Sequence, residues 1–245
     1  AYLIFGLLLK LFNSMKKYFA ILSVILFLNS CKNTDDPTKK PEDNRFTEVV
    51  LAMGLDEPME MTFLPDNKVL VVERKGGIKL INEDTKETSE VGWINVNTKY
   101  TNKEGRTREA EEGLMGVVAD PNFATNNWIY LYFADPDTAK HVLARYEFKN
   151  DKLVEESQKV LLEVKTQREE CCHTGGGMTW DTQGNLYLTV GNNTVNPRSG
   201  ASNMNELPDN TNEDDQRGPS NSMDLRGKIL RIHPEVDGTY SIPEG

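Results

Sequence analysis

Residues 61–73 read MTFLPDNKVLVVE, and this stretch sets the pattern for the rest of the chain. Four residues suited to a strand (61–64) precede the turn Pro-Asp-Asn, and a second stretch rich in β-branched residues (68–73) follows it. Proline, aspartate and asparagine supply the backbone angles and side-chain hydrogen bonds that reverse a strand. The stretch therefore predicts two antiparallel strands joined by a tight turn.

The same arrangement occurs twice more along the chain. VVADPNF at 117–123 is followed by WIYLYF at 128–133, and MTWDTQGNLYLTV occupies 178–190. The turn acids of the three copies are spaced 54 and 61 residues apart. Repeats of this length with several strands each are typical of β-propeller blades. Each copy is followed by one further predicted strand, and these three strands are Gly77–Ile81, His141–Phe148 and Lys228–Ile232.

The sequence predicts an all-β chain with about three propeller blades, whereas closed propellers typically have four to eight. The nearest candidates for a helix are Ala110–Leu114 and Asp151–Val164, and the latter also fits a hairpin plus a strand. We therefore interpret residues 46–245 as the N-terminal half of a propeller domain. The alternative is a small two-sheet sandwich, which has little reason to carry the long polar insert Asn192–Asp224.

The composition of the chain restricts its class. With 245 residues, 38% hydrophobic and 27% charged, the chain is globular rather than disordered. A net charge of −10 without a compensating run of Lys and Arg argues against nucleic-acid binding. Three cysteines and three histidines cannot build a disulfide scaffold or a zinc-finger array.

The first 31 residues contain two apolar runs, Tyr2–Leu9 and Tyr18–Leu28, each shorter than the about 20 residues that cross a bilayer. The second run follows Met-Lys-Lys at 15–17, as in a secretory signal. It ends at Leu-Asn-Ser-Cys, which resembles the bacterial lipobox and implies lipidation of Cys31. The alternative is a single membrane anchor over residues 2–28, interrupted by three lysines.

We therefore interpret residues 1–31 as upstream residues plus a lipoprotein signal peptide. Residues 32–45, KNTDDPTKKPEDNR, form a flexible polar linker, because they have too little apolar surface to offset the entropy of ordering. The expected location is outside the cytoplasm, in the periplasm or at the cell surface, with the protein anchored to a bacterial membrane through lipid on Cys31.

Taken in order, several segments resemble the soluble glucose/sorbosone dehydrogenase family, six-bladed propellers that use pyrroloquinoline quinone (PQQ) and calcium. The likeness begins near Phe46 and runs to the end of the chain. The matching segments are Gly54–Met59, Val72–Ile78, Glu111–Gly116, Asp120–Phe123, His173–Met178, Asn185–Gly191 and Asp224–Ile232.

The resemblance implies a secreted quinoprotein that oxidises the C1 hydroxyl of an aldose or a related sugar or alcohol. Electrons would pass to an acceptor outside the cytoplasm. The family's quinone and calcium ligands come largely from later blades, beyond Gly245, so no cofactor-binding residue is assigned here. We expect the fragment by itself to be inactive.

The resemblance places His173 as the general base. An imidazole suits this task because its ordinary pKa lies near neutrality, so that it can take a hydroxyl proton while hydride moves to the quinone. The glycines at 175–177 would let the backbone pass close to a flat cofactor. The family orients its histidine with an acid, for which Asn192 stands here; an asparagine carbonyl still accepts the imidazole N–H. The alternative for His173 is a hydrogen-bonded structural residue.

Two further residues are candidates for substrate binding. Glu111 lies where the family has a polar side chain that touches the sugar, although a solvated loop acid is the alternative. Cys172 replaces an acid that precedes the histidine in the family's glucose enzymes. Cys171 and Cys172 form either a vicinal disulfide or two free thiols. A metal centre is not expected, because in an extended stretch only Cys171 and His173 share a face.

Two other functions remain open at this stage. The substitutions at 172 and 192 favour a carbohydrate-binding or scaffold propeller that has lost its catalytic pair. A metal-dependent lactonase would need an acidic cage that we do not locate. The acidic insert Asn205–Asp224 lacks EF-hand spacing and is interpreted as a solvated loop.

Overall fold

The structure is a computed structural model that describes residues 45–194 and 217–244. The chain divides into two compact units, Ala1–Val49 and Val50–Gly245, and the architecture below is that of the second. The signal peptide, the lipidation site Cys31, linker residues 32–44 and most of the acidic insert lie outside the described residues. In the part of the chain that is described, no helix has both the length and the apolar character needed to cross a membrane.

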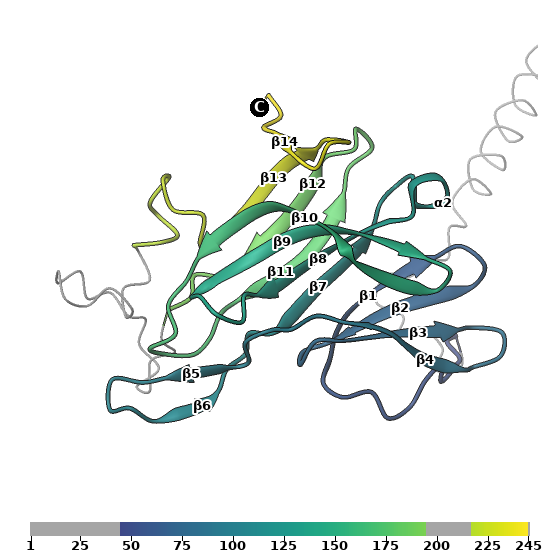
Figure 1. The fold of residues 1–245 in the computed structure, drawn as a ribbon, viewed down its shortest axis with the longest axis horizontal. Helices are drawn as coiled ribbons and strands as arrows, with labels where there is room; N and C mark the ends of the chain where they lie inside the picture. Colours follow the sequence, from purple (N-terminus) through teal and green to yellow (C-terminus); the bar gives the residue numbers. More distant parts are fainter. Residues whose placement is uncertain (1–44, 195–216, 245) are drawn as a thin grey trace, which may run out of the picture. The chain divides into compact units, whose positions relative to one another are not determined.

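Three four-stranded antiparallel sheets make up the second unit (Figure 1). In each sheet the strands pair in chain order, so each sheet is a meander of the kind that forms a propeller blade. The prediction of an all-β chain with about three blades is confirmed. The blades contain, in order, β1 (Pro58–Leu64), β2 (Lys68–Glu73), β3 (Gly77–Asn82) and β4 (Thr88–Trp93); β7 (Leu114–Ala119), β8 (Trp128–Ala134), β9 (Lys140–Lys149) and β10 (Lys152–Lys165); and β11 (Gly175–Trp180), β12 (Leu186–Val190), β13 (Lys228–Pro234) and β14 (Tyr240–Ser241).

The repeated turns form for the reason that their sequence suggests. The Asp120 and Asp181 carboxylates each accept a hydrogen bond from the backbone N–H two residues later, at 2.8 Å in both cases. Asp66 adopts a positive φ of 60°, which aspartate tolerates better than most residues. The three strands predicted after the turns correspond to β3, β9 and β13.

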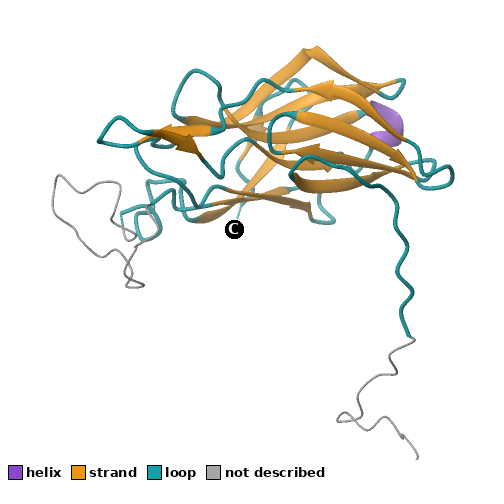
Figure 2. Ribbon diagram, turned by 90° about the horizontal axis from the view of Figure 1, so that it is seen from below, coloured by secondary structure: helices purple, strands orange, loops and turns teal. Residues whose placement is uncertain are grey.

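Helical structure is almost absent from the described residues (Figure 2), which contain one four-residue helix, α2 (Phe123–Asn126). The helix considered at Ala110–Leu114 does not form, because Leu114 begins β7. The stretch at 151–164 forms the long strand β10, as its strand alternative predicts. A small hairpin of β5 (Lys99–Thr101) and β6 (Thr107–Glu109) precedes the second blade and was not anticipated from the sequence.

The first strands of the three blades lie side by side, with β1 against β7 and β7 against β11. We call the contact between β1 and β7 the first seam and the contact between β7 and β11 the second seam. At the second seam the backbones approach so closely that a Cβ added to Gly116 would lie 2.1 Å from the Gly176 carbonyl oxygen. Glycine is therefore required there. At the first seam the Ala119 N–H donates to the Thr62 hydroxyl at 3.1 Å.

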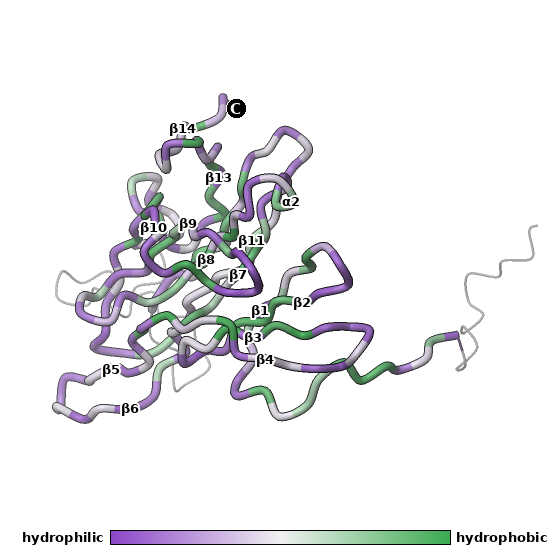
Figure 3. Tube along the Cα trace, turned by 45° about the vertical axis from the view of Figure 1, so that its right-hand side comes forward, coloured by the Kyte–Doolittle hydropathy of each residue, from purple (hydrophilic) through white to green (hydrophobic). Residues whose placement is uncertain are grey.

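Each seam encloses a hydrophobic core, and Figure 3 shows hydrophobic segments along the strands. Leu70, Ile78 and Leu131 are fully buried in the first core. Trp180 spans the second seam, with its ring 5.1 Å from that of Tyr130 and its Nε1–H donating to the Ala119 carbonyl at 2.8 Å. Full burial of one aliphatic side chain, such as Leu70 or Leu131, contributes about 1.5–3 kcal/mol to stability, so the seams join the blades firmly.

The first strand of the first blade also presents apolar side chains to solvent. Thr62 and Leu64 face the second blade, and because side chains alternate along a strand, Met61 and Phe63 point the opposite way. Met61 is 54% exposed and Phe63 is 65% exposed. This face of β1 is an apolar sheet surface without a cover among the described residues.

Candidate active site

The segment 166–174 connects β10 to β11 and carries Cys171, Cys172 and His173. It has no strand structure, and φ is 151° at Cys172 and 59° at His173. The extended conformation considered for 171–173 is therefore not adopted, and the alternation of faces expected from it does not apply. The turned backbone is held by its own hydrogen bonds, because the His173 carbonyl accepts from the Asn193 N–H at 3.1 Å.

The His173 ring is half-buried and is oriented by Asn192, two residues past the end of β12. Nδ1 of His173 lies 3.0 Å from Oδ1 of Asn192. With the amide oxygen facing the ring, Nδ1 carries the proton of the neutral imidazole and Nε2 keeps a free lone pair. Nε2 makes no hydrogen bond to any residue that the structure describes, so it can accept a proton from a molecule bound beside it.

Glu111 joins the same group of residues from the loop that precedes β7. Its Oε2 accepts the His173 backbone N–H at 2.9 Å. Its carboxylate also lies within 4.8 Å of both sulfur atoms of Cys171 and Cys172. The structure therefore brings together all four residues singled out in the sequence, His173, Asn192, Glu111 and Cys172. Contact of Glu111 or Cys172 with a sugar stays a prediction.

Cys171 and Cys172 are joined in a disulfide, one of the two alternatives that the sequence left open. Glu111 and the two cysteines are the one cluster of candidate metal ligands found in the described part of the chain. Because the sulfurs are bonded to each other, they offer no thiolate to an ion, and one carboxylate does not hold a zinc ion.

The glycines around this group have packing roles that the sequence does not reveal. A Cβ added to Gly191 would lie 1.8 Å from the His173 carbonyl oxygen, so no larger residue fits there without movement. Gly176 has a φ of 126°, and its added Cβ would lie 2.8 Å from Cβ of Met115 on the second blade. Gly176 is thus required by the seam between blades, whatever cofactor lies nearby.

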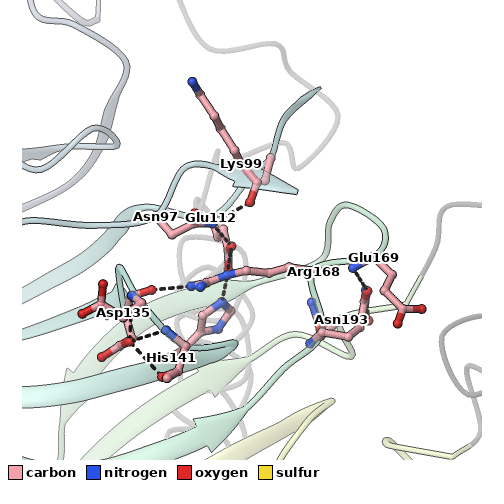
Figure 4. A network of polar contacts seen from close by, with 12 residues as sticks. Asn97, Lys99, Glu112, Asp135, His141, Arg168, Glu169 and Asn193 are labelled. Carbon is pink, nitrogen blue, oxygen red and sulfur yellow. Dashed lines mark hydrogen bonds and ion pairs between the residues drawn. The ribbon is translucent and has the colours of Figure 1, made fainter. Parts of the chain in front are cut away.

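A network of polar contacts around Glu112, His141 and Arg168 (Figure 4) was missed in the sequence analysis. Nε2 of His141 lies 2.9 Å from Oε2 of Glu112, and Nδ1 of His141 lies 3.3 Å from the hydroxyl of Tyr132. Burial, and then the negative charge of Glu112, raise the pKa of the Tyr132 phenol, so the hydroxyl stays protonated. Glu112 directly follows Glu111, and nothing in the letters distinguishes the buried acid from the exposed one.

The other two histidines have structural surroundings. His141 is 1% exposed and belongs to this network. His233 is half-buried on β13, and its Nδ1 lies 3.0 Å from Oδ1 of Asn185.

These features define a partial β-propeller with an oriented, accessible imidazole beside the strand ends of its third blade. A family model described as glucose/sorbosone dehydrogenase matches residues 55–243. The chain belongs to the glucose/sorbosone dehydrogenase family, as the resemblance of its segments predicted.

Individual relatives are distant. An uncharacterised protein of Synechocystis is 24% identical over 140 residues, which cover 56% of this chain and 33% of that protein. An oxidoreductase of Thermus thermophilus, described as a glucose dehydrogenase, has a similar structure with a TM-score of 0.53 and 24% identity, over 74% of this chain and 45% of that one. The PQQ-bound form of an aldose sugar dehydrogenase from Streptomyces coelicolor gives 0.54 and 20%, over 75% and 46%. Likenesses at these identities show the fold alone, and the chain spans less than half the length of these relatives.

One described residue has the chemistry that a quinone-dependent dehydrogenase requires of a base. Nε2 of His173 has a free lone pair that can accept a proton, and the residue lies next to the start of the glycine-rich strand β11. No described residue is assigned to the quinone itself. Among residues 45–194 and 217–244 there is likewise no cluster of acids to hold calcium, since the single candidate cluster contains the disulfide.

Proposed function

We propose that the complete protein is a quinone-dependent sugar dehydrogenase that oxidises the C1 hydroxyl of an aldose or a related alcohol, with His173 as its general base. The observation that carries this proposal is the half-buried imidazole with Nδ1 fixed by Asn192 and with a free Nε2. Membership of the glucose/sorbosone dehydrogenase family supports the reaction class. Similarity in fold to a PQQ-bound aldose sugar dehydrogenase supports PQQ as the cofactor.

The residues of this chain would each perform a separate part of the reaction. Nε2 of His173 accepts the proton of the C1 hydroxyl, while Asn192 keeps the ring in the required tautomer and orientation. Glu111 holds the backbone of His173 through its N–H. When bound, the quinone would supply an acceptor for the hydride of C1. The alcohol would thus lose a hydride, which carries two electrons and one proton, and a second proton from its hydroxyl, which Nε2 of His173 takes up.

The surroundings of the reaction are part of the proposal. Lipid on Cys31 would anchor the protein outside the cytoplasm, within reach of an extracytoplasmic electron acceptor. Calcium would be bound with the quinone, as the family resemblance implies. Asn192 stabilises a protonated imidazole less than a carboxylate does, so we expect a weaker base than in the family's glucose enzymes.

A second candidate function has its own observations. The family's acids are replaced by Cys172 and Asn192, and Cys172 is held in a disulfide. A propeller that has lost catalysis but still binds carbohydrate would tolerate both changes. The two candidates differ in whether the protein transfers electrons.

The test uses the full-length protein reconstituted with PQQ and calcium, with dye reduction followed over a panel of aldoses. His173→Gln should lower kcat about 100-fold or more, because general bases typically contribute about 10²–10⁴. His233→Gln is the matched control, since His233 also has Nδ1 bonded to an asparagine at 3.0 Å, and it should retain activity. Sugar binding without dye reduction by the unmodified protein would favour the second candidate. Equal rates for the two variants would show that His173 is not the base.

A further inference from the structure

The segment that carries His173 is held by side chains as well as by backbone hydrogen bonds. The backbone bonds run from the Thr166 N–H to the Ala139 carbonyl, from the Asn193 N–H to the His173 carbonyl and from the Gly191 N–H to the Thr174 carbonyl. Segment 166–174 leaves β10 and enters β11 without joining a sheet. Its backbone receives one hydrogen bond from the β5–β6 hairpin, where the Thr101 N–H donates to the Arg168 carbonyl at 2.9 Å. Asn193 holds Gln167, the residue before Arg168, because Oδ1 of Asn193 accepts the Gln167 N–H at 2.7 Å. A further anchor is the Arg168 side chain.

Arg168 reaches from the segment into the second blade (Figure 4). Its Nε lies 2.6 Å from Oε1 of Glu112, and its Nη2 donates to the Asp135 carbonyl. The side chains of Arg168 and Glu112 are 16% and 5% exposed. Removal of one partner from an ion pair with so little exposure to water is costly, because the remaining charge stays largely buried without a partner.

Glu112 is itself fixed from three directions. Oε2 meets His141 at 2.9 Å, and Oε1 also accepts the Asn97 side-chain amide. Its backbone carbonyl accepts from Nη1 of Arg74 at 3.3 Å, and the same Nη1 donates to the Ala110 carbonyl at 2.8 Å. Arg74 therefore ties the loop that carries both glutamates to the first blade.

The neighbouring glutamates act on the same segment at two points. Glu112 points inward and binds Arg168, while Glu111 points outward and accepts the N–H of His173. The disulfide of Cys171 and Cys172 lies between these two attachment points. If Arg168 moved away from Glu112, the segment would lose the buried ion pair that sets its distance from Glu111.

We propose that the buried pair of Glu112 and Arg168 is a positioning pair for His173: it holds segment 166–174 so that the His173 N–H meets Glu111 and the ring meets Asn192. This inference depends on the proposed function only in giving His173 a catalytic task. The alternative is that the pair stabilises the fold as a whole without a specific effect on His173.

Arg168→Met and Arg145→Met in the full-length protein separate these alternatives. Arg145 is the matched control: it is a buried arginine, it donates to the Glu235 and Val236 carbonyls at 2.8 and 2.9 Å, and it lies on the Trp128 ring rather than near His173. Two readouts are needed, both without quinone or sugar. They are hydrogen exchange of the His173 amide and the NMR signal of the His173 Nδ1 proton.

Arg168→Met should speed exchange of the His173 amide about tenfold or more, as expected when a locally held segment opens. It should also abolish the Nδ1 proton signal, whereas Arg145→Met should leave the signal and change exchange less than about twofold. Arg168→Lys keeps the charge and should lie between Arg168→Met and the unmodified protein. Equal effects of Arg168→Met and Arg145→Met would overturn the proposal. Should Arg168→Met not fold, unchanged exchange in Arg168→Lys would overturn it equally. A loss of dehydrogenase activity in Arg168→Met without these changes would count against the positioning pair. An unmodified protein without dehydrogenase activity, with the exchange and NMR results as expected, would count against the proposed function alone.

Discussion

Nδ1 of His173 and Oδ1 of Asn192 lie 3.0 Å apart, so an amide occupies the place from which a carboxylate could stabilise a protonated imidazole. Asn192→Asp should therefore raise the dye-reduction rate of the reconstituted full-length protein at neutral pH, by about tenfold. Steady-state kinetics of the two proteins under identical cofactor loading measure the effect.

Asn193→Asp provides the control for a new charge at this place in the chain. Asn193 is buried and its Oδ1 accepts the Gln167 N–H, whereas the ring of His173 is bonded to Asn192. The Asn193→Asp variant should not raise the dye-reduction rate. A rate for Asn192→Asp that is equal to or below that of the unmodified protein would argue against Asn192 as the orienting group.

Gly191→Ala should destabilise the fold by about 1–3 kcal/mol, the usual cost of forcing an atom into a filled site. The added methyl would lie 1.8 Å from the His173 carbonyl oxygen, which belongs to the backbone and cannot rotate away. Chemical denaturation measures the loss. Gly177→Ala on β11 is the control, because its Cβ would come no closer than 3.3 Å, to the Thr189 hydroxyl. Equal losses in the two variants would mean that the contact at Gly191 is not as tight as described.

The repeated strand and turn pattern allowed the blades to be predicted because it is local. Asp120 and Asp181 accept hydrogen bonds from the backbone two residues later, and contacts between residues this close in sequence can be predicted from a short stretch of it. The β5–β6 hairpin escaped prediction, because its strands are three residues each and lie in a polar stretch. The considered helix at Ala110–Leu114 does not form, because its last residue, Leu114, begins β7 and pairs with Phe133 on β8.

Asp224 should make a pH-dependent contribution to stability. A hydrogen bond from Arg226, at 2.6 Å, is the main cause that lowers the pKa of the Asp224 carboxyl, and burial opposes it. Because the folded-state pKa lies below that of the unfolded chain, about 3.9, the stabilisation is complete above that value and disappears as pH falls through the folded-state pKa.

The corresponding variant is Asp224→Asn. It should lower the free energy of unfolding by about 1 kcal/mol at neutral pH, and this difference should vanish in strong acid. Urea denaturation over a series of pH values gives the comparison. Asp237→Asn, on an exposed turn where a Thr239 hydrogen bond lowers the pKa, should show a smaller difference at neutral pH. A constant difference at all pH values would contradict an electrostatic origin.

Residues 46–245 expressed alone should self-associate through the apolar face of β1. Met61 and Phe63 are 54% and 65% exposed on this face, and exposed apolar strands promote association. The double variant Met61→Thr with Phe63→Thr should reduce the sedimentation coefficient at a given protein concentration. Val160→Thr, at a single exposed position on β10, should not. A monomeric unmodified chain would rule out this association.

The candidate site was predictable only where its residues belong to segments that resemble a known family. His173, Asn192 and Glu111 were found in this way, and the structure brings them together from three separate segments. Arg168 and Glu112 were not found, because their importance comes from burial. The pairing of a segment residue with an acid 56 positions away leaves no local pattern in the sequence.

The close approach of Gly116 and Gly176 limits how proteins built on this plan can diversify. Where two blades meet backbone to backbone, mutation has no room to introduce new functional groups. New side chains can then be introduced at the turns near the strand ends, such as the loop with Glu111 and the segment with Cys172, which this close backbone approach does not restrict. The seam between the blades can stay unchanged through long divergence, while the loops at the strand ends acquire different side chains.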